Sequence, residues 1–416
     1  MALLAFVAAA AAVVLVLAVA GIGGSLALLL TGVAGGAVML LAAWWFLSHR
    51  GVARWAAGCL AVLAPVVVAV LFARARLVGV VVVFGLLWWA AIAAARRALA
   101  VPVPEPVTER TAAPRHPYLI MNPRSGGGKV GRFRLAERAR ALGAEVFLLD
   151  GSTVDVAEVA RRAVRDGADL LGVAGGDGTQ ALVAGVAAEH GVPFLVISAG
   201  TRNHFALDLG LDLTDPAAGL DALTDGEEVR VDLGRIGDRT FVNNASFGAY
   251  ATVVHSPRYR DAKVGTALDL LPDALTGRSP LRLTVDGATL DGPHAVLISN
   301  NAYRLDSGQR PRLDRAELGV LAAGRRRVVV RTTRDAVVDA DLPEIPVGVD
   351  GEALTFAPPV RCVTVPGALR VRVPRQRPGV PVPPPQLDWR RLRHLAFGRV
   401  TQALDGAAVS GEPLAA

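Results

Sequence analysis

The chain has 416 residues, a length that allows two or three domains. Cys59 and Cys362 are its two cysteines, and their separation excludes a disulfide framework or a zinc site built on cysteine pairs. The net charge of +7 favours an anionic partner, but basic and aromatic residues do not interleave, so we expect an anionic membrane surface and no nucleic acid.

Four apolar runs precede residue 100, and each approaches the roughly 20 residues that a helix needs to cross a bilayer. They are Ala2–Ala20, Ser25–Leu47, Val52–Ala73 and Leu77–Ala95. We therefore expect about four transmembrane helices over residues 1–100. Buried core helices are the alternative, and four such runs in succession disfavour it.

Arginines near these runs predict the orientation of the membrane region. The positive-inside rule places arginine-bearing loops in the cytoplasm. Applied to Arg50, Arg54, Arg96 and Arg97, it puts both ends of the membrane region in the cytoplasm. Arg74 and Arg76 argue for the reverse. We expect a multi-pass protein of the cell membrane whose following domains are cytoplasmic.

A proline-rich linker over residues 101–116 leads to a short strand at residues 118–122 and a glycine-rich loop. A strand that runs into such a loop with a lysine is a phosphate-binding form, although Val130 stands where a Walker A loop has Ser or Thr. The expected ligands are Asn122, Ser125, Gly126, Gly127 and Lys129, the last as a mobile positive charge. A flexible loop with a solvated lysine is the alternative.

A second strand–turn–helix unit reads Gly175-Gly176-Asp177-Gly178-Thr179 at its turn. Glycines allow the backbone to approach a ligand closely, and the N-terminus of the helix that begins near Thr179 attracts anions. Asp177 would repel a bare phosphate, so we expect it to hold a metal ion or a sugar hydroxyl. A capped Gly/Asp turn is the alternative.

A third loop, residues 198–206, follows a strand at Pro193–Ile197. Thr201 can donate to a phosphate, and Asn203 can bridge a nucleotide or a metal-bound water; a capped helix start is the alternative. Strands and helices alternate over residues 117–228, which predicts an α/β nucleotide-binding domain with a parallel sheet. Ligands of such sheets bind at the carboxyl ends of the strands, where these loops lie.

Short β-branched runs follow, and they predict a β-rich domain over residues 229–374. One helix, near Lys263–Leu275, is expected to interrupt it. The turn at Asp350-Gly351-Glu352 reads on its own as a tight hairpin turn.

Five ordered motifs together resemble the catalytic domain of the diacylglycerol kinase and sphingosine kinase superfamily, in its bacterial lipid kinase branch. They are Asn122–Gly126, Gly175–Thr179, Gly200–Ala206, Phe241–Asn243 and Asp350–Glu352. The resemblance covers about residues 115–375. It implies a multi-domain chain in which the α/β domain and the all-β-rich domain enclose the active site in a cleft.

The same resemblance implies ATP and Mg²⁺ as cofactors and a lipid in the membrane as substrate, most readily diacylglycerol. Glu352 corresponds to the family's base, and Asp350 would orient the site or bind a metal water. Phosphoryl transfer requires mainly positioning and neutralisation of charge. NAD-kinase-like phosphorylation of a small molecule and a non-catalytic nucleotide- or lipid-binding membrane sensor are the alternatives, and a homodimer is compatible with the sequence.

Two positions depart from the family pattern. His204 replaces an aspartate that, in relatives, joins a network with the residues equivalent to Asp177 and Asp232. Arg315 replaces a carboxylate in the loop that holds a structural magnesium ion, so Asp314 is retained there only as a weak candidate ligand.

Residues 375–416 are expected to form a proline-rich spacer and a basic tail. Leu387–Leu404 has the pattern of a short amphipathic helix with several arginines. It would lie on an anionic membrane surface or pack on the kinase domain.

Overall fold

The computed structural model describes residues 1–99, 107–150, 154–248, 251, 279–304, 308–324, 328–380 and 387–397. Two compact units divide the chain: residues 1–103 with 384–416, and residues 104–383. The helix expected at Lys263–Leu275 lies outside the described residues, as does the part of the tail beyond residue 397.

Three helices in the first unit are long and apolar enough to cross a membrane: α1 (Ala2–Ser48), α2 (Val52–Arg74) and α3 (Val78–Leu99). The first two predicted runs form the two arms of one continuous element, α1, which is kinked between them. The backbone of α1 leaves the helical conformation at Gly21, where φ is 66°. Only a residue without a β-carbon adopts that conformation easily, so the bend lies there.

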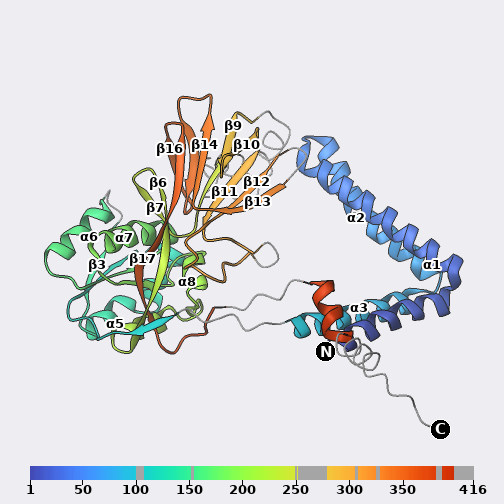
Figure 1. Ribbon diagram of the computed structural model, residues 1–416, viewed down its shortest axis with the longest axis horizontal. Coiled ribbons are helices and arrows are strands. Elements are labelled where there is room, and N and C mark those ends of the chain that lie inside the picture. The colour runs from blue at the N-terminus through green and yellow to red at the C-terminus, as the bar shows by residue number, and fades with distance from the viewer. Residues whose placement is uncertain are drawn as a thin grey trace, which may run out of the picture. The chain divides into compact units, whose positions relative to one another are not determined.

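The two arms of α1 pack against different helices (Figure 1). Ala2 and Ala5 share a buried cluster with Ala94 and Ala95 of α3. On the second arm, a β-carbon added to Gly35 would lie 2.4 Å from Cγ2 of Val68 in α2. The N-terminal end of α1 and the C-terminal end of α3 therefore lie together.

The second unit begins with β1 (Thr108–Arg110), which pairs with β6 (Gly226–Ile236) inside the segment predicted as a linker. Parallel pairing follows, and it joins β2 (Pro117–Met121), β3 (Glu145–Leu148), β4 (Leu170–Ala174) and β5 (Phe194–Ile197) in the order β5-β4-β2-β3. The residues of β4 and β5 are buried throughout, as expected for a sheet covered on both faces.

Helices cover this sheet, and α6 has a capping residue that the sequence shows. They are α4 (Lys129–Arg132), α5 (Leu135–Ala141), α6 (Val156–Arg165), α7 (Asp177–His190) and α8 (His204–Asp208), with 3-10 turns at Ser125–Gly127 and Pro216–Leu223. The Asp155 carboxylate caps α6 by accepting from the N–H groups of Ala157 and Glu158. The α/β domain with a parallel sheet is confirmed.

A β-rich part follows in the same unit. Its six-stranded antiparallel sheet has the order β13-β12-β11-β8-β15-β16. The strands are β8 (Asn244–Gly248), β11 (Ala295–Asn300), β12 (Leu318–Ala323), β13 (Val328–Thr333), β15 (Ile345–Val349) and β16 (Glu352–Phe356). The second β layer contains β7 (Arg239–Phe241), β9 (Leu281–Val285), β10 (Ala288–Asp291) and β14 (Asp335–Ala340).

One long strand, β17 (Val360–Pro374), links the two parts of this unit (Figure 1). Its first half pairs with β14, and at residues 371–372 it pairs in parallel with β5. It also pairs with β6 along its length, with a bulge between Val365 and Leu369. The predicted boundary at residue 374 therefore assigns to the β-rich domain a segment that completes the α/β sheet.

Candidate active site

Three loops leave the carboxyl ends of the parallel strands β2, β4 and β5 and pack together. A β-carbon added to Gly126 would lie 2.5 Å from the carbonyl oxygen of Ala199. One added to Gly200 would lie 2.8 Å from Cα of Gly176. The loops thus approach each other backbone to backbone, which any larger residue at these glycines would prevent.

The second loop ends at the N-terminus of α7, where Gly176 is the N-cap and Asp177 the first helical residue. The helix thus begins two residues before Thr179, which lies in its first turn. Free N–H groups in such a turn attract anions. Ser125 lies beside this turn, since its hydroxyl is 3.9 Å from a β-carbon built on Gly176.

Asp177 has one carboxylate oxygen available to a ligand. Its Oδ2 accepts a long hydrogen bond of 3.3 Å from the backbone N–H of His204. Its Oδ1 is buried and has no hydrogen-bond partner within the described residues. An unsatisfied buried carboxylate oxygen is costly, so this atom suits a cation or a hydroxyl donor. The exposed His204, which replaces the family's aspartate, contacts Asp177 through its backbone N–H.

In the β-rich part, Asp350 holds the turn before β16 against the Phe241–Asn243 motif. Its Oδ2 accepts from the N–H of Val242 at 2.8 Å, and its Oδ1 accepts from those of Asn243 at 2.8 Å and Asn244 at 3.0 Å. The pKa of Asp350 is raised to about 7, mainly because the carboxyl group is buried. The charge of Asp177 also raises this pKa, while the three N–H donors oppose the shift. The carboxylate of Asp350 therefore fixes the turn that carries Glu352.

The Glu352 carboxylate meets the turn of the second loop. A β-carbon added to Gly178 would lie 2.4 Å from Oε1 of Glu352 and 2.8 Å from its Cδ. Partial burial raises the pKa of Glu352 above its ordinary value, and the nearby charge of Arg239 lowers it. An acceptor carboxylate thus lies against the N-terminal turn of α7.

A fully buried arginine joins the α/β part to the β-rich part. The guanidinium of Arg310 forms an ion pair with Asp208 of α8, with 2.6 Å between Nη2 and Oδ2 and 2.8 Å between Nε and Oδ2. Its Nη1 donates to the carbonyls of Val242 and Asn300, and its Nη2 donates to Oδ1 of Asn243. Arg310 therefore connects the third loop's helix to the segment that Asp350 holds.

Two residues expected to contact a nucleotide are instead used to hold the loops. Lys129 Nζ donates to the carbonyls of Ser198 at 3.1 Å and Leu213 at 3.4 Å, so it is a fixed cross-link and not the mobile charge that we expected. Asn203 is buried in a left-handed conformation, accepts from the N–H of Gly200, and donates to the carbonyls of Ser198 and Gly200. Its amide shapes the third loop and does not point to a ligand.

Two other expected ligands, Asn122 and Thr201, lie at the first and third loops. Asn122 Oδ1 accepts from the N–H of Arg124 and so forms the turn that precedes Ser125. Thr201 is exposed at the tip of the third loop. Asn122 is half-buried, so the side chain of Thr201 is the more open of the two.

The weak metal candidate Asp314 is occupied by a protein cation. Its two carboxylate oxygens accept from Nε and Nη2 of Arg312 at 2.6 and 2.5 Å. Asp232 accepts from Asn301, Ala316 and Gly367, so it fixes this loop instead of joining Asp177. No three His, Cys, Asp or Glu side chains form a metal-binding group within the part of the chain that the structure describes. The loop does not fit a structural magnesium ion.

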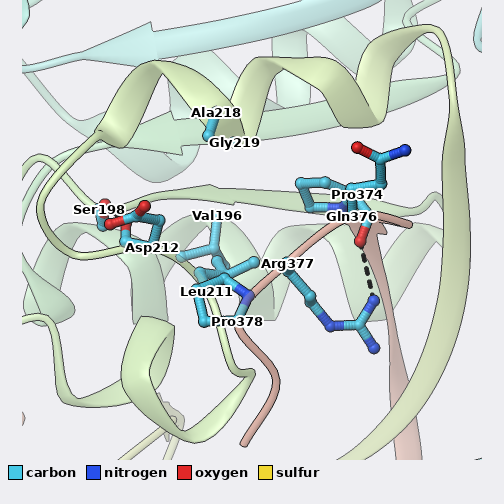
Figure 2. Close-up of a pocket in the computed structure, with 10 residues that line it drawn as sticks. All are labelled: Val196, Ser198, Leu211, Asp212, Ala218, Gly219, Pro374, Gln376, Arg377 and Pro378. Carbon is cyan, nitrogen blue, oxygen red and sulfur yellow. Dashed lines mark hydrogen bonds between the residues drawn. The ribbon is translucent and has the colours of Figure 1, made fainter.

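A cavity of about 60 Å³ lies behind the third loop (Figure 2). Val196, Ser198, Leu211 and Asp212 line it on one side and the segment after β17 on the other. Arg377 in that segment donates to the carbonyl of Pro374, as the figure shows. The cavity is too small for a nucleotide.

Sequence reasoning missed Arg310, Arg239 and Asp208. Arg310 lies in a polar stretch with no periodic pattern, so nothing local indicates that it is buried. Asp208 had a usable signal, since it ends an apolar helical segment and a buried aspartate requires a partner.

The chain is similar in sequence and fold to known diacylglycerol kinases. The family model of the diacylglycerol kinase catalytic domain matches residues 116–236. A diacylglycerol kinase of Mycobacterium tuberculosis (strain ATCC 25618 / H37Rv) is 28% identical over 293 residues, which are 62% of this chain and 94% of the relative. One of Staphylococcus epidermidis (strain ATCC 12228 / FDA PCI 1200) is 40% identical over 96 residues, which are 23% of this chain and 30% of the relative.

A solved structure supports the fold. A protein of Bacillus anthracis str. Sterne, described provisionally as a diacylglycerol kinase, superposes with a TM-score of 0.51 at 18% identity, over 64% of this chain and 97% of that one. The matched domain, the relative aligned over nearly its whole length and the shared fold lead to one conclusion. This chain contains a catalytic domain like that of the diacylglycerol kinases, with apolar helices before it.

Proposed function

We propose that this protein is a membrane-anchored, ATP-dependent lipid kinase that phosphorylates a lipid hydroxyl, with diacylglycerol as the acceptor and phosphatidic acid as the product. One observation carries the proposal: the Glu352 carboxylate lies against Gly178, in the first turn of the helix that follows the Gly175–Thr179 loop. This contact brings a base to an anion-binding turn.

The three glycine loops form the donor side. Ser125, the loop amides and Thr201 would contact the phosphates of ATP, while Lys129 and Asn203 hold the loops that carry those amides. Magnesium that arrives with ATP would neutralise phosphate charge, and the unpartnered Oδ1 of Asp177 is the oxygen suited to hold it.

Glu352 forms the acceptor side. Its carboxylate would take the proton of the lipid hydroxyl as the oxygen forms a bond to the γ-phosphorus, and ADP would leave as the bond to the β-phosphate oxygen breaks. The raised pKa of Glu352 makes it a stronger proton acceptor than a glutamate with an ordinary pKa. Asp350 would maintain the turn that presents Glu352.

Anchoring suits this chemistry because the substrate remains in the bilayer. The helices α1, α2 and α3 are apolar enough to span it. We propose a multi-pass arrangement in the cell membrane, with the kinase unit on the cytoplasmic side, where ATP is available. Each arm of the kinked α1 would cross once, which gives four spans. Met1 and Leu99 then lie on one side, in agreement with the packing of Ala2 against the end of α3.

The test is transfer of labelled phosphate. Purified full-length protein is incubated with γ-labelled ATP, Mg²⁺ and a total membrane lipid extract, and the labelled lipid is identified. Glu352→Gln should lose turnover by about 10²- to 10⁴-fold and retain ATP binding. Glu344→Gln, at an exposed glutamate in the same part of the chain, is the matched control and should remain active.

Other outcomes would identify the alternatives. ATP binding without transfer to any lipid, unaffected by Glu352→Gln, would indicate a membrane sensor. Phosphorylation of a soluble nucleotide in the absence of lipid would indicate an NAD-kinase-like activity. Label in a lipid other than phosphatidic acid would retain the kinase and change the acceptor.

A further inference from the structure

The described tail helix, residues 389–397, packs on the apolar helices of the first unit (Figure 1). Leu392 is completely buried and shares a cluster with Ala2, Ala5 and the end of α3. The Phe6 ring lies 6.4 Å from the Trp389 ring and 5.4 Å from the Phe397 ring, between centroids. The tail helix therefore packs on the membrane helices of its own unit.

The exposed surface of the tail helix carries both arginines and large apolar side chains. The exposed basic side chains that gather here, from the tail helix and from the last turn of α3, are Arg96, Arg97, Arg390, Arg391 and Arg393; we call them the basic collar. Trp389 is 55% exposed, Leu395 51% and Phe397 42%.

Acidic side chains are scarce around the collar. Residues 1–99 contain no Asp or Glu. Asp388 is the acid nearest to the tail helix in sequence, and it accepts from the N–H groups of Arg390 and Arg391 as the cap of that helix. The positive charges of the collar therefore have no acidic partner supplied by the membrane helices.

The position of the collar matches the surface of a bilayer. Arg96 and Arg97 end an apolar helix long enough to span, so they would lie where the hydrocarbon core meets the head groups. The tail helix packs at that same end, and an exposed indole beside arginines suits this interface.

We propose that the basic collar is a binding site for anionic phospholipid head groups, with the tail helix fixed to the membrane helices by Leu392 and Phe6. This site is separate from the proposed kinase cleft and does not depend on catalysis. Because the chain leaves the first unit after α3 and returns to it at the tail helix, the kinase unit is connected to the membrane through both of its ends.

The test measures which lipids surround Trp389. Full-length protein with its other five tryptophans changed to Phe is placed in nanodiscs of phosphatidylcholine that contain about 30% phosphatidylglycerol, an anionic lipid. Bromine is carried either on the phosphatidylglycerol or on an equal fraction of the phosphatidylcholine. We expect brominated phosphatidylglycerol to quench Trp389 more strongly, since arginines near the surface favour anionic lipid.

Two variants that lose the same number of positive charges show whether the lipid preference comes from the basic collar or from net charge. Arg390→Gln, Arg391→Gln and Arg393→Gln together should remove the difference in quenching and lower the preference for the anionic lipid by about 10- to 100-fold. Arg134→Gln, Arg138→Gln and Arg140→Gln, at exposed residues of the other unit, should leave it unchanged.

A second measurement tests the proposal without the tryptophan substitutions, in case the single-tryptophan protein does not fold. Native mass spectrometry of otherwise unmodified protein, extracted from the same bilayers, counts the retained phosphatidylglycerol with and without the three tail arginines. Equal quenching by both brominated lipids, or equal retention by wild type and the tail variant, would overturn the proposal.

Discussion

The contact between Glu352 and Gly178 leads to a prediction that separates positioning from folding. A β-carbon introduced by Gly178→Ala would lie 2.4 Å from Oε1 of Glu352. An ordinary contact needs roughly 3.5 Å, so the carboxylate must move by about 1 Å. A misplacement of about 1 Å can cost about 10²-fold in rate, or about 3 kcal/mol of transition-state stabilisation.

The same substitution should not destabilise the protein. Gly178 lies in the first turn of α7, where alanine is favoured over glycine by up to about 1 kcal/mol. The assay measures kcat/KM for phosphate transfer to diacylglycerol, together with the thermal midpoint, for Gly178→Ala, Glu352→Gln and the double variant. Activity should fall about 10²-fold in Gly178→Ala while the midpoint holds or rises.

A double-mutant cycle tests the cause of the loss. If Gly178→Ala acts by displacing Glu352, it should cost little in the Glu352→Gln background. Losses that multiply in the double variant, or a fully active Gly178→Ala, would refute the reasoning that this contact positions the base.

Three further predictions follow from the cleft. Arg310→Met should destabilise the protein by about 3–5 kcal/mol because it leaves Asp208 buried and unpaired, and adding Asp208→Leu should recover much of that loss in thermal unfolding. The deprotonated form of Glu352 is the base, so kcat/KM should fall as pH decreases through its raised pKa, and Arg239→Gln, which removes the charge that lowers this pKa, should move that acid limb to higher pH. Removal of Mg²⁺ with EDTA should leave the thermal midpoint of the nucleotide-free protein unchanged because a guanidinium already occupies Asp314; a clear drop would reveal a structural metal ion.

Local patterns in the sequence were enough to predict much of this protein. Apolar runs of sufficient length indicated membrane helices, although the number of separate helices depended on the bend at Gly21. Strand–loop–helix units predicted a parallel sheet, and a parallel sheet places its loops at one edge. The loops that begin at Asn122, Gly175 and Ser198 could therefore be assigned to a single site by their order in the chain.

Tertiary structure decided which side chains within those loops are free to meet a ligand. Lys129 and Asn203 look like ligand contacts in sequence, yet their donors are used by loop carbonyls that no strand or helix satisfies. Such pairings depend on which backbone groups remain unpaired after folding, and local sequence does not reveal that.

The longest-range contacts were decided in the same way. The sequence places Asp350-Gly351-Glu352 in a hairpin turn; its place against α7 depends on the antiparallel sheet and on the buried Arg310 that connects α8 to the Phe241–Asn243 segment. The amphipathic pattern of the tail predicts a helix and leaves its partner open. The buried site for Leu392 exists only because the two ends of the membrane helices come together in three dimensions.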